Sequence, residues 1–291
     1  MPDLTAPGAW DSAIAGVDGI AHVVGSVDVF VRDAAGAAKE ELIWQIELLE
    51  AARRAGSVKS VVFTSSAWAA WTPGKDQKWL VLDEKSWNDE VVEIAATGKG
   101  EGMAGFMAQK TLVEKGVWEW VRREKPGFAF NSVLPDTVMG DVLDPVNQGI
   151  PSTAGMVHWV WEGEHVEVLD MMEPQWHVDC QDVAKLYVAL LATSPRVDGE
   201  RIFAFGDKYS WFKVAEILKR LYPEHAEKVA KVRDAGWCEA EVSDQRALEM
   251  LRRLGQHQWT SVETSVQQNA ESWMKLETGG VTDHKYARHA N

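Results

Sequence analysis

Short apolar runs alternate along the chain with longer segments whose apolar residues recur every three to four positions. Residues 20–25, 60–66 and 128–135 have the first pattern, which is typical of buried strands. Residues 37–55 and 107–123 have the second pattern, which is typical of amphipathic helices. Strands that alternate with helices of this length form a parallel sheet with helices on its faces. The sequence therefore predicts an α/β fold.

The composition limits the kinds of partner that the protein can have. The 291 residues include 44 acidic and 30 basic side chains, which gives a formal net charge of −14. Nucleic acids require a concentrated basic face, so we do not expect a nucleic-acid partner. The two cysteines, Cys180 and Cys238, lack C-x-x-C spacing and indicate a reduced compartment. With no apolar run long enough for a membrane span and no signal-like start, we expect a cytoplasmic protein without a membrane partner.

Several segments occur in an order that is known from one family. They are VVFTSS (61–66), FNSVLPDTVMG (130–140), PQWHVDCQDVAKLYVALL (174–191), ERIFAFGD (200–207) and QWTSVETSVQQN (258–269). Together they resemble extended short-chain dehydrogenase/reductases, in the branch of dihydroflavonol-reductase-like and aldehyde-reductase-like enzymes. In this family a serine, a tyrosine and a lysine reduce a carbonyl group with NADPH on a Rossmann-type sheet. The likeness covers nearly the whole chain.

The resemblance assigns two of the three catalytic positions to matching residues. The serine corresponds to Ser66 and the lysine to Lys110, but the tyrosine position, four residues before the lysine, holds Phe106. A phenyl ring cannot donate a proton to the developing alkoxide, and such general-acid help is typically worth about 10²–10⁴-fold in rate. The sequence thus predicts that the family's proton donor is missing.

A second departure concerns the start of the chain. The family begins with three strands and a Gly-x-x-Gly-x-x-Gly turn that holds the cofactor's pyrophosphate. Only 19 residues precede the strand at Ile20, whereas a βαβ unit takes roughly 30. We therefore expect a truncated Rossmann-type parallel sheet, without the first three strands and the glycine loop, and no cofactor.

The resemblance also predicts how the chain divides into domains. Residues 1–140 would form the truncated Rossmann-like domain. Residues 141–291 would mainly form a smaller, mostly helical substrate-binding or lid domain, with 181–206 returning to the sheet.

The main functional hypothesis at this level is a cofactor-independent, non-redox enzyme of the isomerase, lyase or cyclase type. It would act on a small carbonyl or phenolic metabolite, possibly in secondary metabolism. Ser66 would polarise the carbonyl group, and Lys110 would act as a base or a Schiff-base nucleophile once burial lowers its pKa. Asp136, which follows the proline of the third strand, is the preferred new acid or base.

Two alternatives remain open. The chain could be an NADPH-dependent carbonyl reductase with a mis-started or substituted sequence, or a catalytically inactive binding protein. Six further residues are candidates for contact with a substrate, although each has a purely structural explanation: Phe106, Trp68, His22, His158, Trp44 and Glu47. The close His, Asp and Cys of HVDC (177–180) match a structural strand of the family, so we expect no metal site.

The expected truncation has a consequence for assembly. In the strand order of the family, loss of the first three strands leaves the strand at residues 20–27 as an exposed apolar edge. Such an edge pairs readily with another chain. We therefore expect a homodimer through residues 20–30, unless the N-terminal segment folds back over its own edge.

Overall fold

The computed structural model describes residues 3–74, 77–98, 100–193 and 196–278. The strands are β1 (Gly19–His22), β2 (Ser60–Thr64), β3 (Val81–Leu82), β4 (Ala129–Pro135), β5 (Thr137–Met139), β6 (Gln175–Asp179), β7 (Arg201–Ala204), β8 (Lys208–Tyr209) and β9 (Glu241–Val242). The α-helices are α1 (Asp11–Ile14), α2 (Ala34–Ala55), α3 (Asp89–Ala96), α4 (Met103–Glu124), α5 (Pro145–Gln148), α6 (Ser152–Glu162), α7 (Val166–Met171), α8 (Cys180–Thr193), α9 (Trp211–Leu221), α10 (Gln245–Arg253) and α11 (Val262–Thr278). Two 3-10 helices, η1 (Ala67–Ala69) and η2 (Pro223–His225), complete the described elements.

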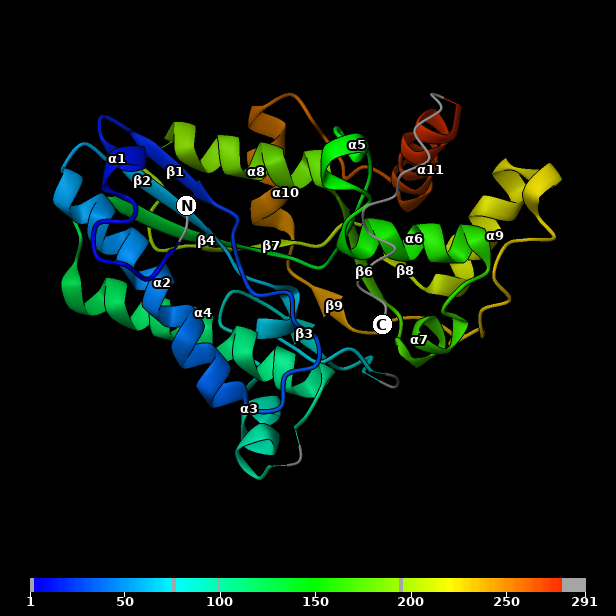
Figure 1. The fold of residues 1–291 in the computed structure, drawn as a ribbon, viewed down its shortest axis with the longest axis horizontal. Coiled ribbons are helices and arrows are strands. Elements are labelled where there is room, and N and C mark those ends of the chain that lie inside the picture. Colours follow the sequence, from blue (N-terminus) through cyan, green and yellow to red (C-terminus); the bar gives the residue numbers. More distant parts are fainter. Residues whose placement is uncertain (1–2, 75–76, 99, 194–195, 279–291) are drawn as a thin grey trace.

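The central sheet consists of four parallel strands in the order β1-β2-β4-β7, with β1 at one edge. Helices α2 and α4 cover one face, and α8 and α10 cover the other (Figure 1). Successive residues of β2 point to opposite faces of the sheet: Val61 packs in the core under α2 and α4, and Val62 packs in the core under α8. Since both faces are buried, the strands are continuous apolar runs.

Helix α2 has clear end signals and packs closely on α4. The Asp33 side chain caps the helix by accepting a hydrogen bond from Gly36 N at 2.9 Å, and Gly56 ends it in the left-handed conformation with φ 66°. A β-carbon at Gly116 of α4 would come within 2.7 Å of a methyl group of Leu42. Glycine at this position therefore allows the two helices to approach each other.

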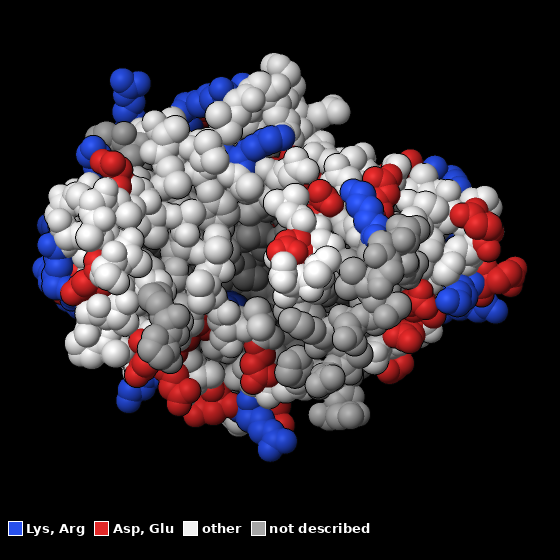
Figure 2. All heavy atoms as spheres, turned by 45° about the horizontal axis from the view of Figure 1, so that its top comes forward, with Lys and Arg blue, Asp and Glu red and all other residues white. Residues whose placement is uncertain are grey.

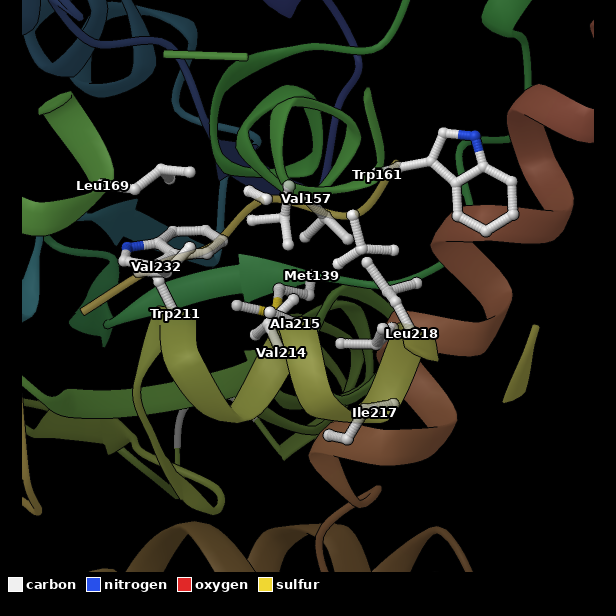
Figure 3. Packing of buried hydrophobic residues seen from close by; sticks show 14 of the residues in the cluster. Met139, Val157, Trp161, Leu169, Trp211, Val214, Ala215, Ile217, Leu218 and Val232 are labelled. Carbon is white, nitrogen blue, oxygen red and sulfur yellow. The ribbon is translucent and has the colours of Figure 1, made fainter. Parts of the chain in front are cut away.

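The second part of the chain builds a smaller helical unit. Helices α5, α6, α7, α9 and α11 lie together beside the central sheet, with the short sheet β5-β6-β8 among them (Figure 1). Figure 3 shows its core, in which Val214 and Leu218 of α9 face Val157 of α6 and Met139 of β5. Burial of apolar surface between helices from distant parts of the chain holds this unit together.

The structure confirms the elements that the sequence predicts. The strand and helix patterns fall on β1, β2, β4, α2 and α4, with ends that differ by a few residues. An α/β fold with a Rossmann-like parallel sheet and a helical substrate domain is thus established. The first strand ends at His22 rather than Gly25, because the chain leaves the sheet there to reach α2. Truncation of the sheet and the exact domain limits stay predictions.

The surface is acidic without a basic face in view. In Figure 2, acidic and basic side chains are interspersed over the face shown, and the basic ones form no continuous patch. Among the described residues, no helix is long and apolar enough to cross a membrane.

Apolar side chains around the edge strand lead to the first prediction. Val23, Val27 and Phe30 are 64%, 78% and 80% exposed. If residues 20–30 join two copies, light scattering at low micromolar concentration will give a mass twice the chain's 32.4 kDa. The double variant Val23→Lys/Val27→Lys will give the mass of a monomer, because burying two cations in the interface opposes association.

The matched control for this prediction is Leu143→Lys, which places a charge on an exposed apolar residue in the other domain and should leave the dimer intact. A wild-type protein that is monomeric under these conditions would contradict the prediction.

Candidate functional site

The candidate catalytic side chains gather at the carboxyl edge of the central sheet. Ser66 follows β2, Asp136 follows β4, and His22 is the last residue of β1. Phe106 and Lys110 occupy successive turns of α4, near its N-terminal end. In open α/β sheets, ligands bind in the crevice outside the carboxyl ends of the strands.

Ser66 has a hydroxyl group that can serve a ligand. Its Oγ accepts a hydrogen bond from Trp68 N at 3.2 Å and so caps η1. The hydroxyl proton makes no hydrogen bond to any described residue, and the side chain is half-buried. Trp68 lies beside it, with its Nε1 donating to Gln175 Oε1 at 3.1 Å. Ser66 can therefore donate a hydrogen bond to a carbonyl oxygen.

Phe106 and Lys110 lie one above the other on α4. The Lys110 Nζ atom is 5.2 Å from the centre of the Phe106 ring, and Trp68 packs edge-on against the same ring at 5.9 Å. The spacing of four residues places both side chains on one face of the helix. A buried phenyl ring thus occupies the position four residues before Lys110.

Lys110 is paired with a buried carboxylate that the sequence did not point out. Its Nζ donates to Glu41 Oε1 at 3.4 Å, and Glu41 is only 3% exposed. Burial lowers the pKa of Lys110, while the negative charge of Glu41 raises it less strongly. The site therefore contains an ion pair between α2 and α4.

Three other groups hold the Glu41 carboxylate. Gln45 Nε2 donates to it at 3.2 Å, Gln109 Nε2 at 2.8 Å and Ser26 N at 3.3 Å. Gly25 allows this packing, because a β-carbon there would lie 3.1 Å from Lys110 Nζ. The sequence analysis did not name Glu41 or Gln109. Glu41 could have been found, because it is a carboxylate on the apolar, buried face of a predicted helix.

A cavity of about 510 Å³ opens beside this ion pair. Its walls come from residues 26–33, from α2 and from α4, and they include Glu41, Trp44 and Gln109. Asp28, Asp33 and Glu40 also line it, together with Arg32. A volume of this size is typical of small-molecule sites.

Asp136 is half-buried in the turn between β4 and β5. Its Oδ2 accepts a hydrogen bond from Trp176 N at 3.1 Å, and its Oδ1 accepts one from Thr137 Oγ1 at 3.4 Å. Burial raises the pKa of this carboxyl to about 7. A carboxyl group with such a pKa can both take up and release a proton near neutral pH.

The remaining candidates are distributed over several environments. His22 is 4% exposed and bonds through Nε2 to Gln45 Oε1, and burial lowers its pKa, which favours the neutral ring. Trp44 lines the cavity and meets the His22 ring edge-on. Glu47 lies away from Lys110 and bonds to Arg54 at 2.8 Å. His158 packs against Trp273 in the helical unit.

A model of the NAD dependent epimerase/dehydratase family matches residues 2–206. The chain therefore belongs to this family, and the resemblance to extended short-chain dehydrogenase/reductases is confirmed.

The relatives extend this result to nearly the whole chain. Aldehyde reductase 2 of Sporidiobolus salmonicolor is 30% identical over 276 residues, which cover 91% of this chain and 78% of the relative. Ketoreductase adrE of Penicillium rubens is 34% identical over 271 residues, which cover 92% of this chain and 78% of the relative. The fold is similar to yeast methylglyoxal/isovaleraldehyde reductase Gre2 complexed with NADPH, with a TM-score of 0.77, 18% identity, and coverage of 95% of this chain and 83% of that one.

These findings correct the main hypothesis from the sequence. The prediction of a cofactor-independent isomerase, lyase or cyclase is wrong, because relatives matched over nine tenths of the chain are an aldehyde reductase and a ketoreductase. That prediction was based on Phe106 and on the residues before Ile20, and the similarity to reductases along nearly the whole chain outweighs both.

The raised pKa of Asp136 yields a test by pH. A carboxyl that titrates near 7 in the folded state and near 3.8 when unfolded stabilises the protein at low pH, and this contribution is lost as pH rises through 7. Between pH 4.5 and 7.5 we expect the free energy of unfolding of the wild type to fall by about 1–2 kcal/mol relative to Asp136→Asn, after allowance for partial exposure.

Urea denaturation at a series of pH values measures this difference. Asp18→Asn, at an exposed surface ion pair, is the control. Parallel pH profiles for the wild type and Asp136→Asn would show that Asp136 has an ordinary pKa.

Proposed function

We propose that the protein is an NAD(P)H-dependent carbonyl reductase that converts a small aldehyde or ketone to an alcohol. The observation that carries this proposal is the similarity to an aldehyde reductase and to ketoreductases over more than nine tenths of the chain. When bound, the cofactor supplies a hydride to the carbonyl carbon. Several relatives are named ketoreductases, which favours a ketone as substrate.

The described residues fit the sugar portion of such a cofactor. Lys110 is buried beside a cavity, and its 3.4 Å contact with Glu41 is longer than a typical charge-assisted hydrogen bond, so its remaining N–H groups can bond hydroxyl oxygens. The carboxylates of Asp28, Asp33 and Glu40 in the cavity do not suit a phosphate group. The phosphates would therefore bind outside this cavity.

In this proposal Ser66 and Lys110 have separate roles. Ser66 donates its free hydroxyl proton to the carbonyl oxygen and stabilises the charge that develops there. Lys110 binds and orients the ribose. It is also the acid that remains beside Phe106, and its lowered pKa makes release of a proton easier. Asp136 stays a candidate for a second acid at the carboxyl edge.

The Phe106 position provides the most direct test. We expect Phe106→Tyr to raise kcat for carbonyl reduction at least tenfold, since a tyrosine hydroxyl next to the Lys110 ammonium supplies the missing general acid. The measurement is NADPH and NADH oxidation against a panel of aldehydes and ketones. Phe106→Leu, which adds no hydroxyl, should not raise kcat.

If Phe106→Tyr binds cofactor but is no faster than the wild type, the phenyl ring does not occupy the proton donor's position. If neither protein oxidises either cofactor with any carbonyl compound, the reductase proposal is wrong.

Two adjacent serines allow a matched test of carbonyl polarisation. Ser66→Ala should lower kcat/KM at least tenfold, because loss of one such donor costs about 2.7–4 kcal/mol in other enzymes. Ser65→Ala removes a buried hydroxyl that has no partner among the described residues, so its activity should stay within twofold of the wild type. Equal losses in the two variants would argue against a specific role for Ser66.

A further inference from the structure

We propose that Glu41 and Gln109 complete, together with Lys110, a binding site for a vicinal diol. This inference rests on the proposed function, in which the diol is the ribose of a nicotinamide nucleotide. Glu41 would then be a residue that determines cofactor affinity, in addition to the serine and lysine that the family predicts.

The first argument is the balance of donors and acceptors in this cluster. Gln109 is 2% exposed and lines the cavity, and its Oε1 has no hydrogen-bond partner among the described residues. Exchanging its amide oxygen and nitrogen would not remedy this, since the oxygen would then face the Glu41 carboxylate at the present 2.8 Å contact. A buried acceptor without a donor is costly, and a ligand hydroxyl group would satisfy it.

The second argument comes from the ion pair itself. Glu41 Oε1 accepts three hydrogen bonds, whereas Oε2 accepts one, from Gln109. Oε2 thus retains a free lone pair, and Lys110 retains N–H groups that no described residue uses. Two neighbouring hydroxyl groups offer two protons to Oε2 and Gln109 Oε1, and their oxygens accept from Lys110.

A second buried ion pair in the same helix shows what a purely structural pair looks like here. Arg201 bonds to both oxygens of Glu114 at 3.0 Å, and Trp118 and Ser132 donate to the same carboxylate. The Arg201 guanidinium also bonds to two backbone carbonyl groups and stacks on Trp87. The two carboxylates accept equal numbers of hydrogen bonds, so the pairs differ at the cation: Arg201 donates from all three of its nitrogens, whereas Lys110 makes a single bond of 3.4 Å to the described residues.

The surroundings favour a neutral polyhydroxyl group over an anion or an apolar group. Glu41, Gln109 and the carboxylates of Asp28, Asp33 and Glu40 give the cavity wall mostly acceptors. Acceptors of this kind bind hydroxyl protons and repel phosphate oxygens. Trp44 adds one aromatic surface to the same cavity.

Calorimetry with NADPH and NADH tests the role of Glu41. We expect Glu41→Gln to weaken binding at least tenfold, because the amide keeps only one of the two acceptor oxygens and loses the negative charge. Glu50→Gln, on the same helix but outside the cavity and bonded to Arg53, removes the same charge and should leave the affinity within twofold. Equal or tighter binding by Glu41→Gln would overturn the diol site and leave the reductase proposal standing.

A comparison of two ligands, with and without the diol, tests the diol site independently of the proposed reaction and of any effect of a substitution on folding. Wild-type protein should bind nicotinamide riboside at least tenfold more tightly than its 2′,3′-dideoxy analogue, as measured by NMR titration. Gln109→Met should reduce this preference while the melting temperature confirms a folded protein. If the dinucleotides do not bind but this preference exists, the reductase proposal fails and the diol site stands; no preference for the diol overturns the site.

Discussion

The burial of the central sheet on both faces is the constraint on which the rest of the structure depends. Val61 and Val62 of β2 point into different cores, and Val133 of β4 is completely buried. Polar groups inside such a layer must find partners, as Asn131 does with the backbone of Val197 and Glu200. Groups that serve a ligand are consequently displaced to the ends of the strands, where Ser66 and Asp136 lie.

Helix α4 connects this constraint with the chemistry of the site. It carries two buried charges about one turn apart, Lys110 and Glu114, and each pairs with a different part of the fold. Glu114 faces the amino end of the sheet and joins it to β7 through Arg201. Lys110 lies toward the carboxyl edge, where its partner Glu41 lines the cavity. Breaking a buried pair leaves an uncompensated charge, so both partners are expected to persist together through sequence change.

Phe106 shows how family membership and local chemistry can differ. The family is established over residues 2–206 and the relatives over nine tenths of the chain. Even so, the ring of Phe106 is packed against Trp68 and Lys110, without a hydroxyl group. In the proposed function, Ser66 would polarise the carbonyl group and Lys110 would bind the ribose, while proton transfer would depend on groups other than Phe106.

The sequence alone determined the order of strands and helices, because apolar periodicity is a local property that β2, β4, α2 and α4 each display. It also determined that Ser66 comes directly after a strand region and that Phe106 and Lys110 share a helix face. The choice of acidic partner was decided only by tertiary structure. Glu41 and Glu47 lie on one helix about 240° apart around its axis. The sequence analysis named only Glu47, as a candidate for substrate contact, and Glu47 bonds to Arg54. Glu41 meets Lys110 across 69 residues of chain and Gln109 across 68. Such contacts exist only after α2 and α4 have packed on the same face of the sheet.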